Sequence, residues 1–540
     1  MVLLKLALRW EHSCYKLAKK LLGHVFLQYK TTTSNQRSAS GLQTVYPSVT
    51  ECSSSSNLEG QTIVCDDFHG TLLRAPDSLF PYFMLVAFEG GSLLRALLLL
   101  ALSPALCLLG KHEFGMRIMA FVTFCGMRTG DLRLIARTVL PKIFLENLHL
   151  QACEALKGRR AVVLTTLPRL MVEGFLKEYL EVGEVVGAEL QVVKGCYFTG
   201  VISWPDKQRA LRDMVKAGAA IVNLSNVHHH HHLLAKEIYV VREEESRSES
   251  SKMTRNKYPK PLVFHDGRLA FLPTPCEMMA FFMWIPMAIP LAVFRIAMGI
   301  VFPYKISIFI AAVTGIRFRR AGDGKANGEI KKGVVYVCTH RTLLDPVMLC
   351  SALERTVPAV TYSLSRVSEA LAPMRTVRLT RDRGRDAATM RRLLAVEGGL
   401  AVCPEGTTCR EPYLLRFSPL FAEVAEEVVP VALDARVGML YATTASGHKW
   451  LDPVVFMMNP TPGYEVHILP PVRPREMTTG EEGWSAAEVA NRIQKQLAEK
   501  LGFECTALTR RDKYMMLAGN EGVAAPMHRR EPEKQPTNSL

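Results

Sequence analysis

His340 and Asp345, five positions apart, are the first residues in this chain whose types suggest chemistry. A carboxylate beside a histidine holds the imidazole in one tautomer, so that the ring can take a proton from an alcohol. Positions five apart lie about 140° apart on a straight helix, so these side chains can meet only across a turn. The pattern also fits an Asp345 that caps a helix ahead of Pro346. The spacing alone leaves both interpretations open.

A second polar motif, Pro404-Glu405-Gly406-Thr407, follows further along the chain. A glycine lets backbone N–H groups approach an anion, and the threonine adds a hydroxyl. Each motif follows an apolar run typical of a buried strand, residues 333–338 and residues 400–403. Open α/β sheets place their chemistry at the carboxyl ends of such strands. We therefore expect both motifs to meet at one edge of one sheet.

An arginine-rich segment, residues 375–383, lies between the two motifs and is expected to form a short strand and a basic turn. Guanidinium groups aimed at one site would suit a phosphate. A solvated edge strand would explain the same composition. Among these arginines, Arg381 is our candidate for substrate binding.

The motifs, together with Val429-Pro430-Val431, resemble in order and spacing the four blocks of the glycerolipid acyltransferases. Longer segments, residues 258–268, 402–412 and 501–505, resemble the land-plant glycerol-3-phosphate acyltransferases. The resemblance implies that His340 is the general base and that Asp345 orients it. It also implies substrate-binding roles in two of the blocks, for Arg381, Glu405 and Gly406, with Thr407 as a further candidate.

The activity implied by this resemblance is acyl transfer from acyl-CoA to glycerol 3-phosphate, which gives lysophosphatidic acid. A thioester is already activated, so the enzyme must position two substrates, remove one proton and stabilise an oxyanion. We therefore expect acyl-CoA as a co-substrate, with no cofactor and no metal. Two alternatives stay open: an acyltransferase acting on lysophosphatidic acid, and a non-catalytic membrane scaffold.

The first half of the chain has a motif of its own at residues 62–73, which resembles the first motif of haloacid-dehalogenase-like phosphatases. In that family one aspartate attacks phosphorus, and another, two residues later, acts as acid and base. Asp67 stands at the first position, but His69 replaces the second acid. Residues 160–165 resemble the family's strand that ends in a phosphate-binding hydroxyl, here Thr165.

The later acids with which that family holds magnesium are missing from residues 221–237, where the run His228 to His232 stands instead. Magnesium prefers oxygen ligands. We interpret the run as low complexity rather than as a metal site. The sequence thus predicts a degenerate phosphatase domain that keeps its fold without its activity.

Composition favours a membrane surface. The 540 residues carry 66 Lys and Arg against 51 Asp and Glu, a formal charge of +15, with a mean hydropathy of +0.09. A basic and apolar chain suits anionic headgroups and anionic substrates. Nucleic acid is not an expected partner, because no RNA-binding signature or zinc-finger spacing is present. The 13 cysteines form no Cys-x-x-Cys pair, which favours reduced thiols facing the cytosol.

Two apolar segments bear on the membrane. Residues 278–302, interrupted by prolines and Arg295, and residues 306–316 predict one span or a re-entrant hairpin. Arg317, Arg319 and Arg320 would then lie at headgroup level. A helix pair buried against the next domain is the alternative. Residues 96–109 are short for a span and favour a helical cap or an interfacial segment.

The expected fold class is α/β, in five parts. These are a basic amphipathic segment with a Ser/Thr-rich linker (1–58), a haloacid-dehalogenase-like, Rossmann-like domain (59–250), a membrane-associated helical segment (251–327), an acyltransferase domain (328–518) and a disordered tail (519–540). We expect a membrane location in the endoplasmic reticulum. The basic amino-terminal segment makes the mitochondrion the alternative.

Overall fold

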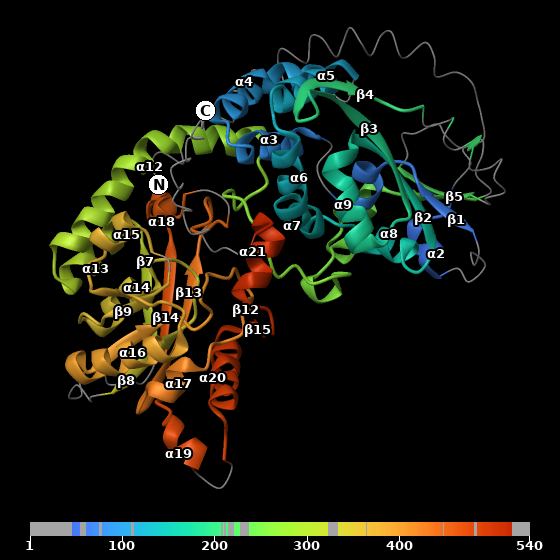
Figure 1. Cartoon of the computed structure of the whole chain (residues 1–540). Coiled ribbons are helices and arrows are strands. Elements are labelled where there is room, and N and C mark those ends of the chain that lie inside the picture. Colours follow the sequence, from blue (N-terminus) through green and yellow to red (C-terminus); the bar gives the residue numbers. More distant parts are fainter. Residues whose placement is uncertain are drawn as a thin grey trace, which may run out of the picture.

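The computed structural model describes residues 46–54, 61–74, 78–109, 113–206, 209, 212–213, 221–226, 237–321, 333–362, 364–445, 448–479 and 483–520. These residues form two α/β parts, each built on a mostly parallel sheet, so the expected fold class is confirmed (Figure 1). The basic segment 1–30, the histidine run and the tail from 521 lie outside the described residues.

The N-terminal part has a six-stranded sheet in the order β4-β3-β2-β1-β5-β6. Its strands are β1 (Thr62–Cys65), β2 (Arg160–Pro168), β3 (Glu184–Val193), β4 (Tyr197–Ser203), β5 (Ile221–Asn226) and β6 (Glu237–Val241). Strand β1 pairs in parallel with both β2 and β5, and all its residues are buried. A strand buried on both faces needs apolar side chains throughout, as its sequence Thr-Ile-Val-Cys largely supplies.

A helical insertion between β1 and β2 supplies most of the helices of this part. The helices are α2 (Val49–Ser54), η3 (Phe68–Leu72), α3 (Phe80–Glu89), α4 (Leu93–Leu109), α5 (Glu113–Phe124), α6 (Thr129–Thr138), α7 (Leu140–Glu146), α8 (Leu150–Leu156), α9 (Arg169–Leu180) and α11 (Glu243–Arg247). Helix α2 lies where a flexible linker was expected. Val49 and Cys52, three residues apart, are fully buried where α2 packs on α8 and β6, so the domain begins before residue 59.

Two apolar helices follow: α12 (Pro275–Val301) and α13 (Tyr304–Val313) contact each other. By length and composition α12 could cross a membrane. It runs through Pro286 and Pro290, which were expected to interrupt it. Packing against α18 (Asp452–Met458) supports the helix where the prolines remove backbone donors. The helix pair thus contacts the next domain, but it is not buried there as our alternative required, because 17% of the apolar stretch of α12 is buried and α13 has no buried residue.

The C-terminal part has a seven-stranded sheet in the order β10-β9-β11-β8-β13-β14-β7. Its strands are β7 (Arg317–Ala321), β8 (Val334–Cys338), β9 (Ala359–Thr361), β10 (Thr376–Arg378), β11 (Gly399–Val402), β13 (Glu427–Arg436) and β14 (Gly463–Ile468). The strands expected before the two motifs, β8 and β11, are neighbours and run parallel. Strand β7, with its three arginines, is an edge of this sheet, so the sheet begins before residue 328.

The remaining elements complete the chain. They are α14 (Asp345–Leu353), α15 (Arg366–Ala370), α16 (Arg383–Glu397), α17 (Leu420–Val424), α19 (Pro474–Thr479), α20 (Ala486–Leu501), α21 (Arg510–Ala518), the short strands β12 (Tyr413–Leu414) and β15 (Glu504–Cys505), and the 3₁₀ turns η5 (Glu249–Ser251), η6 (Arg255–Lys257) and η7 (Lys449–Leu451). Among them, η5 packs on α8 and α11 of the N-terminal part. The predicted amphipathic helix over residues 486–501 is confirmed as α20. It starts at a Ser485–Glu488 capping box and ends at Gly502.

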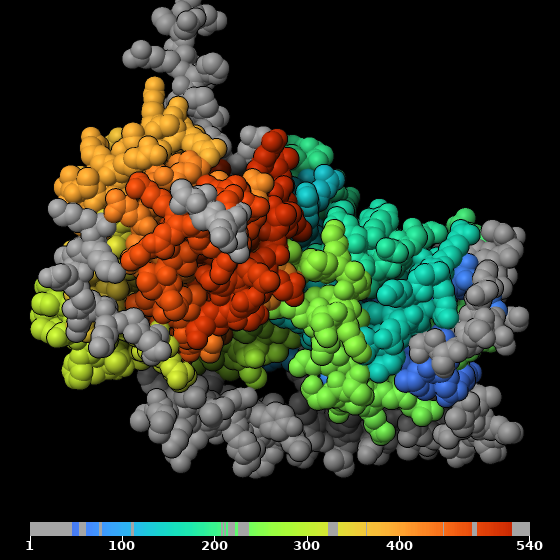
Figure 2. All heavy atoms as spheres, turned by 90° about the horizontal axis from the view of Figure 1, so that it is seen from below, coloured from blue at the N-terminus to red at the C-terminus, as the bar shows by residue number. Residues whose placement is uncertain are grey.

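Residues 258–274 connect the two parts and are bonded to both of them; this segment is called the linker below. The Glu89 carboxylate at the end of α3 accepts from the backbone N–H groups of Arg268 (2.6 Å) and Leu269 (3.0 Å). The Arg268 side chain forms a 2.6 Å ion pair with Asp452 of α18. Figure 2 shows the linker region in green between the teal N-terminal part and the red C-terminal part. The linker is thus a structural joint.

A buried arginine completes this joint. The Arg410 guanidinium donates to His265 Nδ1 (2.9 Å) and to the carbonyl oxygens of Gly267 (2.6 Å) and Thr443 (2.5 Å). It also lies 4.0 Å from the centre of the Tyr441 ring. Charge-assisted bonds to several carbonyls satisfy a cation that could not otherwise be buried.

Gly267→Ala tests the joint. Gly267 has φ +94°, and an added Cβ would lie 3.1 Å from Val139 and 3.2 Å from the Glu89 carboxylate. We expect a loss of about 1–3 kcal/mol in unfolding free energy, seen as a lower thermal midpoint in detergent. Gly174→Ala is the control, because nothing lies within 4 Å of its added Cβ on α9 and alanine favours a helix. Equal thermal midpoints for the two variants would contradict the claim that close packing around Gly267 in the linker stabilises the fold.

Candidate active site

The expected His340–Asp345 pair is formed. His340 follows β8, a turn spans residues 341–344, and Asp345 opens α14, so that His340 Nδ1 lies 2.8 Å from Asp345 Oδ2. Asp345 is completely buried, whereas the His340 side chain keeps 16% of its surface. Because Nδ1 is bonded to the carboxylate, Nε2 is the ring nitrogen left to meet a substrate.

The Asp345 carboxylate is held by its own loop and by a distant strand. Oδ2 accepts from the backbone N–H of Arg341 (2.6 Å), and both oxygens accept from that of Thr342 (3.1 and 3.0 Å). The Tyr464 hydroxyl of β14 donates to Oδ1. Burial, and then the Asp345 charge, raise the pKa of Tyr464 well above its ordinary value, so the phenol stays a donor. The carboxylate therefore has one fixed position.

Glu405 supports the backbone at His340. Its Oε1 accepts from the backbone N–H of His340 (2.7 Å), and its Oε2 accepts from that of Leu415 (2.9 Å). Burial raises the pKa of Glu405, and the Arg341 charge opposes this rise. We expected Glu405 to bind substrate. In the structure, both of its oxygens accept from backbone N–H groups, one from that of His340 and the other from that of Leu415.

Arg341 fixes the segment that follows Glu405. Its guanidinium donates to the carbonyl oxygens of Cys409 (2.7 Å) and Tyr413 (2.9 Å) and lies 4.8 Å from the centre of the Phe503 ring. The backbone N–H of Cys409 in turn donates to the carbonyl of His340 (2.8 Å). The two motifs are thus tied together in both directions.

Gly406 and Thr407 differ in their surroundings. Gly406 has φ +67° and lines two cavities described below. This left-handed conformation suits glycine, which has no Cβ. Thr407 is buried, and its hydroxyl lies 3.5 Å from Lys513 Nζ of α21. Of the two, only Gly406 lines either cavity.

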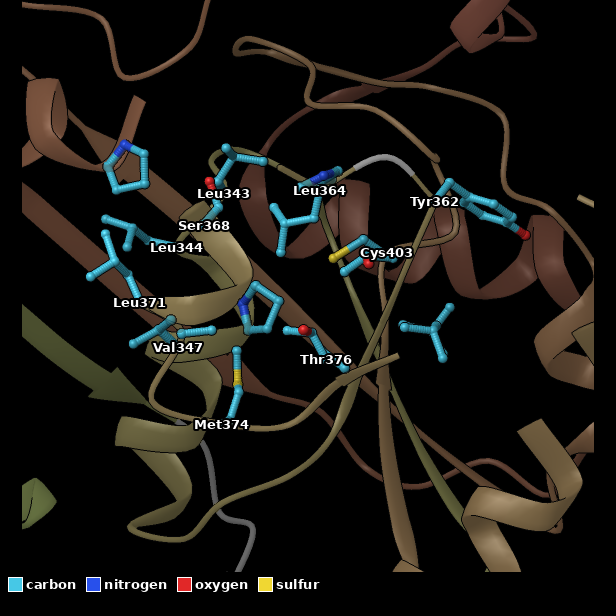
Figure 3. Close-up of a pocket in the computed structure, with 18 of the residues that line it drawn as sticks. Leu343, Leu344, Val347, Tyr362, Leu364, Ser368, Leu371, Met374, Thr376 and Cys403 are labelled. Carbon is cyan, nitrogen blue, oxygen red and sulfur yellow. The ribbon is translucent and has the colours of Figure 1, made fainter. Parts of the chain in front are cut away.

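His340 is one of the residues that line an apolar cavity of about 250 Å³. Figure 3 shows Leu343, Leu344, Val347, Leu371 and Met374 gathered on one side of it, with Tyr362 across from them. Ile296, Gly299 and Ile300 of α12 complete its lining. Its lining is mainly hydrocarbon, which suits an extended apolar ligand with its reactive end at the histidine.

Arg381 occupies a strained turn. It has φ +68°, a conformation that is unfavourable for a residue with a Cβ. Asp386 stabilises the turn, because its carboxylate accepts from the backbone N–H groups of Thr380 (2.7 Å) and Arg381 (2.9 Å). Among the described residues, no carboxylate forms an ion pair with the Arg381 guanidinium, which lies 5.8 Å from the Tyr362 ring centre.

A basic cavity of about 370 Å³ adjoins the apolar cavity. Arg381, Arg383 and Arg510 line it, and Asp386 is the acid among its described lining residues. Arg383 is paired with Glu423. Burial and then the charge of Arg381 lower the pKa of Arg510, as expected for two cations that face one space. Four residues line both cavities: Tyr362, Gly406, Ser418 and Leu420.

The pair of His340 and Asp345, called the dyad below, could be considered as part of a metal site. Within the described part of the chain, one set of three possible ligands lies close together, His340, Asp345 and Cys403, with ligand atoms within 4.8 Å of one another. The Asp345 oxygens already accept several N–H and O–H bonds, and burial raises the pKa of the Cys403 thiol well above its ordinary value. A protonated thiol and an occupied carboxylate suit a hydrogen-bond network better than a metal.

The phosphatase-like motif lies at the end of β1. Asp67 Oδ2 accepts from the backbone N–H of Gly70 (3.0 Å), and Oδ1 accepts from the backbone N–H and hydroxyl of Thr166 (both 3.2 Å). Thr165, our candidate, instead accepts from the backbone N–H of Leu167 (3.1 Å). The hydroxyl that meets Asp67 therefore belongs to the next residue of β2.

The surroundings of His69 do not suit the acid–base role of the aspartate that it replaces. The histidine is buried, and its ring packs edge-on against Tyr82, with centroids 5.6 Å apart. Magnesium needs several oxygen ligands, and here an imidazole occupies the second position while the Asp67 oxygens accept backbone bonds. These residues do not fit a magnesium ion.

Sequence reasoning missed several residues of the C-terminal site. Tyr464 and Arg510 come from β14 and α21, far from the motifs, and nothing local in the sequence marks them. Arg341 lies between His340 and Asp345, and Arg410 lies within residues 402–412, but their sequence neighbours are mostly polar and do not indicate that both arginines are buried.

Comparisons with known proteins agree with the two-part architecture. Residues 62–241 match the family model described as "Glycerol-3-phosphate acyltransferase RAM2-like, HAD-like domain", and residues 313–437 match the model "Acyltransferase". The solved structure of the 1-acyl-sn-glycerophosphate acyltransferase PlsC from Thermotoga maritima is 15% identical, with a TM-score of 0.27, over 43% of this chain and 96% of that one.

Full-length relatives are more similar. Glycerol-3-phosphate acyltransferase 1 of Arabidopsis thaliana is 46% identical across 95% of this chain and 96% of its own length. Glycerol-3-phosphate acyltransferase RAM2 of Petunia hybrida is 43% identical across 84% of this chain and 96% of its own length. The resemblance seen in the motifs is thus confirmed, and the chain belongs to the plant glycerol-3-phosphate acyltransferase family, as an acyltransferase with a haloacid-dehalogenase-like N-terminal domain.

Proposed function

We propose that this enzyme transfers an acyl group from acyl-CoA to a hydroxyl of glycerol 3-phosphate, and that its product, lysophosphatidic acid, keeps the phosphate. The observation that carries the proposal is that His340 lines an apolar cavity, which shares four lining residues with a basic one. An acyl chain suits the first cavity, and a phosphate suits the second.

The chemistry follows from the dyad. Nε2 of His340 accepts the hydroxyl proton while the oxygen attacks the thioester carbonyl carbon, and Asp345 stabilises the imidazolium that forms. When the tetrahedral intermediate collapses, the C–S bond breaks and CoA leaves as a thiolate that recovers the proton from His340. General base catalysis of this kind contributes a factor of about 10²–10⁴ in rate.

Acceptor selectivity rests on the basic cavity. The Arg381 guanidinium has no carboxylate partner among the described residues, so a phosphate dianion would supply its counter-charge. Glycerol 3-phosphate carries that phosphate without a second acyl chain. It therefore needs only the basic cavity, leaving the apolar cavity to the donor.

The enzyme would act at a membrane, where its acyl product accumulates. The apolar helix α12 lines the cavity, and the reduced cysteines suit a cytosol-facing surface. We propose the endoplasmic reticulum as the compartment.

Arg381→Gln tests the acceptor site. With one acyl-CoA, we expect the wild type to prefer glycerol 3-phosphate to lysophosphatidic acid, and the variant to raise KM for glycerol 3-phosphate by about 10–100-fold, since a charge-assisted bond is lost. Arg375→Gln is the control, because Arg375 pairs with Glu397 at the surface and lines neither cavity. A preference for lysophosphatidic acid would overturn the proposed acceptor.

Glu405→Gln separates support of the backbone from substrate binding. A glutamine must turn its NH₂ group toward one of two backbone N–H donors, His340 or Leu415, and lose that bond. We expect kcat and the thermal midpoint to fall together, with about 1–3 kcal/mol of stability lost, while KM for glycerol 3-phosphate changes little. A raised KM at unchanged stability would instead assign Glu405 to the substrate.

Asp67→Asn tests the loss of the phosphatase step. Because the groups around Asp67 do not fit magnesium, the wild type should release no phosphate from lysophosphatidic acid above background. The variant should match it in both phosphate release and acyl transfer. Phosphate release that disappears in Asp67→Asn would show that the N-terminal domain is an active phosphatase.

A further inference from the structure

Helix α4 of the N-terminal part exposes an apolar face. Leu93, Leu94, Leu97 and Leu98 keep between 44% and 76% of their surface, while Ala96 and other residues of the opposite face are buried. The helix contains no acid, and its one base, Arg95, donates to the carbonyl of Cys125. Soluble proteins rarely expose so continuous a row of leucines.

The exposed face continues onto neighbouring helices. Helix α4 contacts α5 and α12, and α12 contacts α13, so the four helices follow one another along one rim of the molecule (Figure 1). Each of them exposes large apolar side chains, among them Phe114 of α5, Val293 of α12 and Phe309 of α13. The rim therefore draws on both the phosphatase-like and the acyltransferase parts.

The bonds of α12 favour a helix that lies on the membrane rather than across it. Trp284 Nε1 donates to the carbonyl of Met458 (2.8 Å), and Arg295 donates to the carbonyls of Asn459 (2.7 Å) and Pro460 (3.1 Å). These bonds hold one side of α12 against the end of α18 along much of its length. A spanning orientation would draw that part of the folded domain into the hydrocarbon, where its loops could not satisfy their polar groups.

The charges beside the rim favour a bilayer as the occupant. Arg317 and Arg319 of β7, immediately after α13, are exposed. Apolar side chains flanked by cations suit acyl chains below anionic headgroups. The apolar cavity also reaches this rim, because Ile296 and Gly299 of α12 line it. A second copy of the chain would cover that approach.

We propose that α4 and α5 of the phosphatase-like domain form, with α12 and α13, one membrane-docking surface on which the chain lies in the interface of an anionic bilayer. The domain that lost its catalytic acid then serves as a second membrane contact. The Glu89–Arg268 bonds and the Arg268–Asp452 ion pair hold the two contacts in one orientation. The cavity beside α12 thereby faces the lipid.

Leu94→Glu, in the full-length chain, is the test. Binding to vesicles of phosphatidylcholine with one quarter phosphatidylserine is measured by flotation at limiting lipid. We expect about a tenfold weaker partition, since one leucine side chain contributes roughly that factor when it leaves water. Val396→Glu is the matched control, because Val396 of α16 is 75% exposed against 76% for Leu94, and α16 packs on α17 and β11 of the C-terminal part. It should bind as the wild type does.

Further measurements on this variant show whether the effect is confined to membrane binding. Leu94→Glu should keep the thermal midpoint and the activity toward a water-soluble short-chain acyl-CoA, because α4 lines neither cavity. Unchanged flotation of Leu94→Glu would overturn the proposal, as would a wild-type dimer that this substitution dissociates.

In sealed microsomes, a membrane-impermeant maleimide should label single cysteines at both ends of α12, at Cys276 and in Val301→Cys, from the same side. Labelling from opposite sides would show a spanning helix instead.

Discussion

The active site depends on one buried carboxylate. Asp345 accepts from His340 Nδ1, from two backbone N–H groups of its own loop and from the Tyr464 hydroxyl. A charge without solvent is tolerated only when such donors surround it, and the same donors leave it no second position. The orientation of the imidazole, the turn after β8 and the start of α14 all follow from this constraint. Glu405 adds the complementary restraint, because it fixes the backbone of His340.

Position relative to two cavities gives this dyad its proposed chemistry. The histidine lines an apolar space that shares lining residues with a basic space, which suits the proposed meeting of a thioester with a phosphorylated alcohol. The apolar space is partly walled by α12, which is bonded to the folded domain on one side and exposes apolar side chains on the other. In our proposal, substrate access and membrane contact therefore depend on the same helix, and the phosphatase-like domain adds α4 to the membrane contact.

The sequence predicted the parts of the site that local rules govern. Apolar runs before each motif correctly indicated parallel strands, and the five-residue spacing required the turn that the structure contains. Long-range contacts were not predictable from local sequence. Tyr464 lies at the site because of the position of β14 in the sheet, and Arg510 lies there because of the path of the chain into α21. Arg295 was interpreted as an interruption of an apolar helix, yet its hydrogen bonds to carbonyls allow it to be buried within one. Glu405 shows the limit of reasoning from motifs. The resemblance implied that it binds substrate, whereas in the structure its carboxylate accepts from backbone N–H groups.

The most direct test of the account is the rate of acyl transfer by His340→Ala, measured with purified protein, saturating glycerol 3-phosphate and one acyl-CoA. The account predicts a fall in kcat of about 10²–10⁴ in a protein that still folds, because the general base is lost while the bonds of the His340 backbone to Glu405 and Cys409 remain. A variant that keeps kcat within a few-fold of the wild type would show that the dyad is not the seat of the reaction.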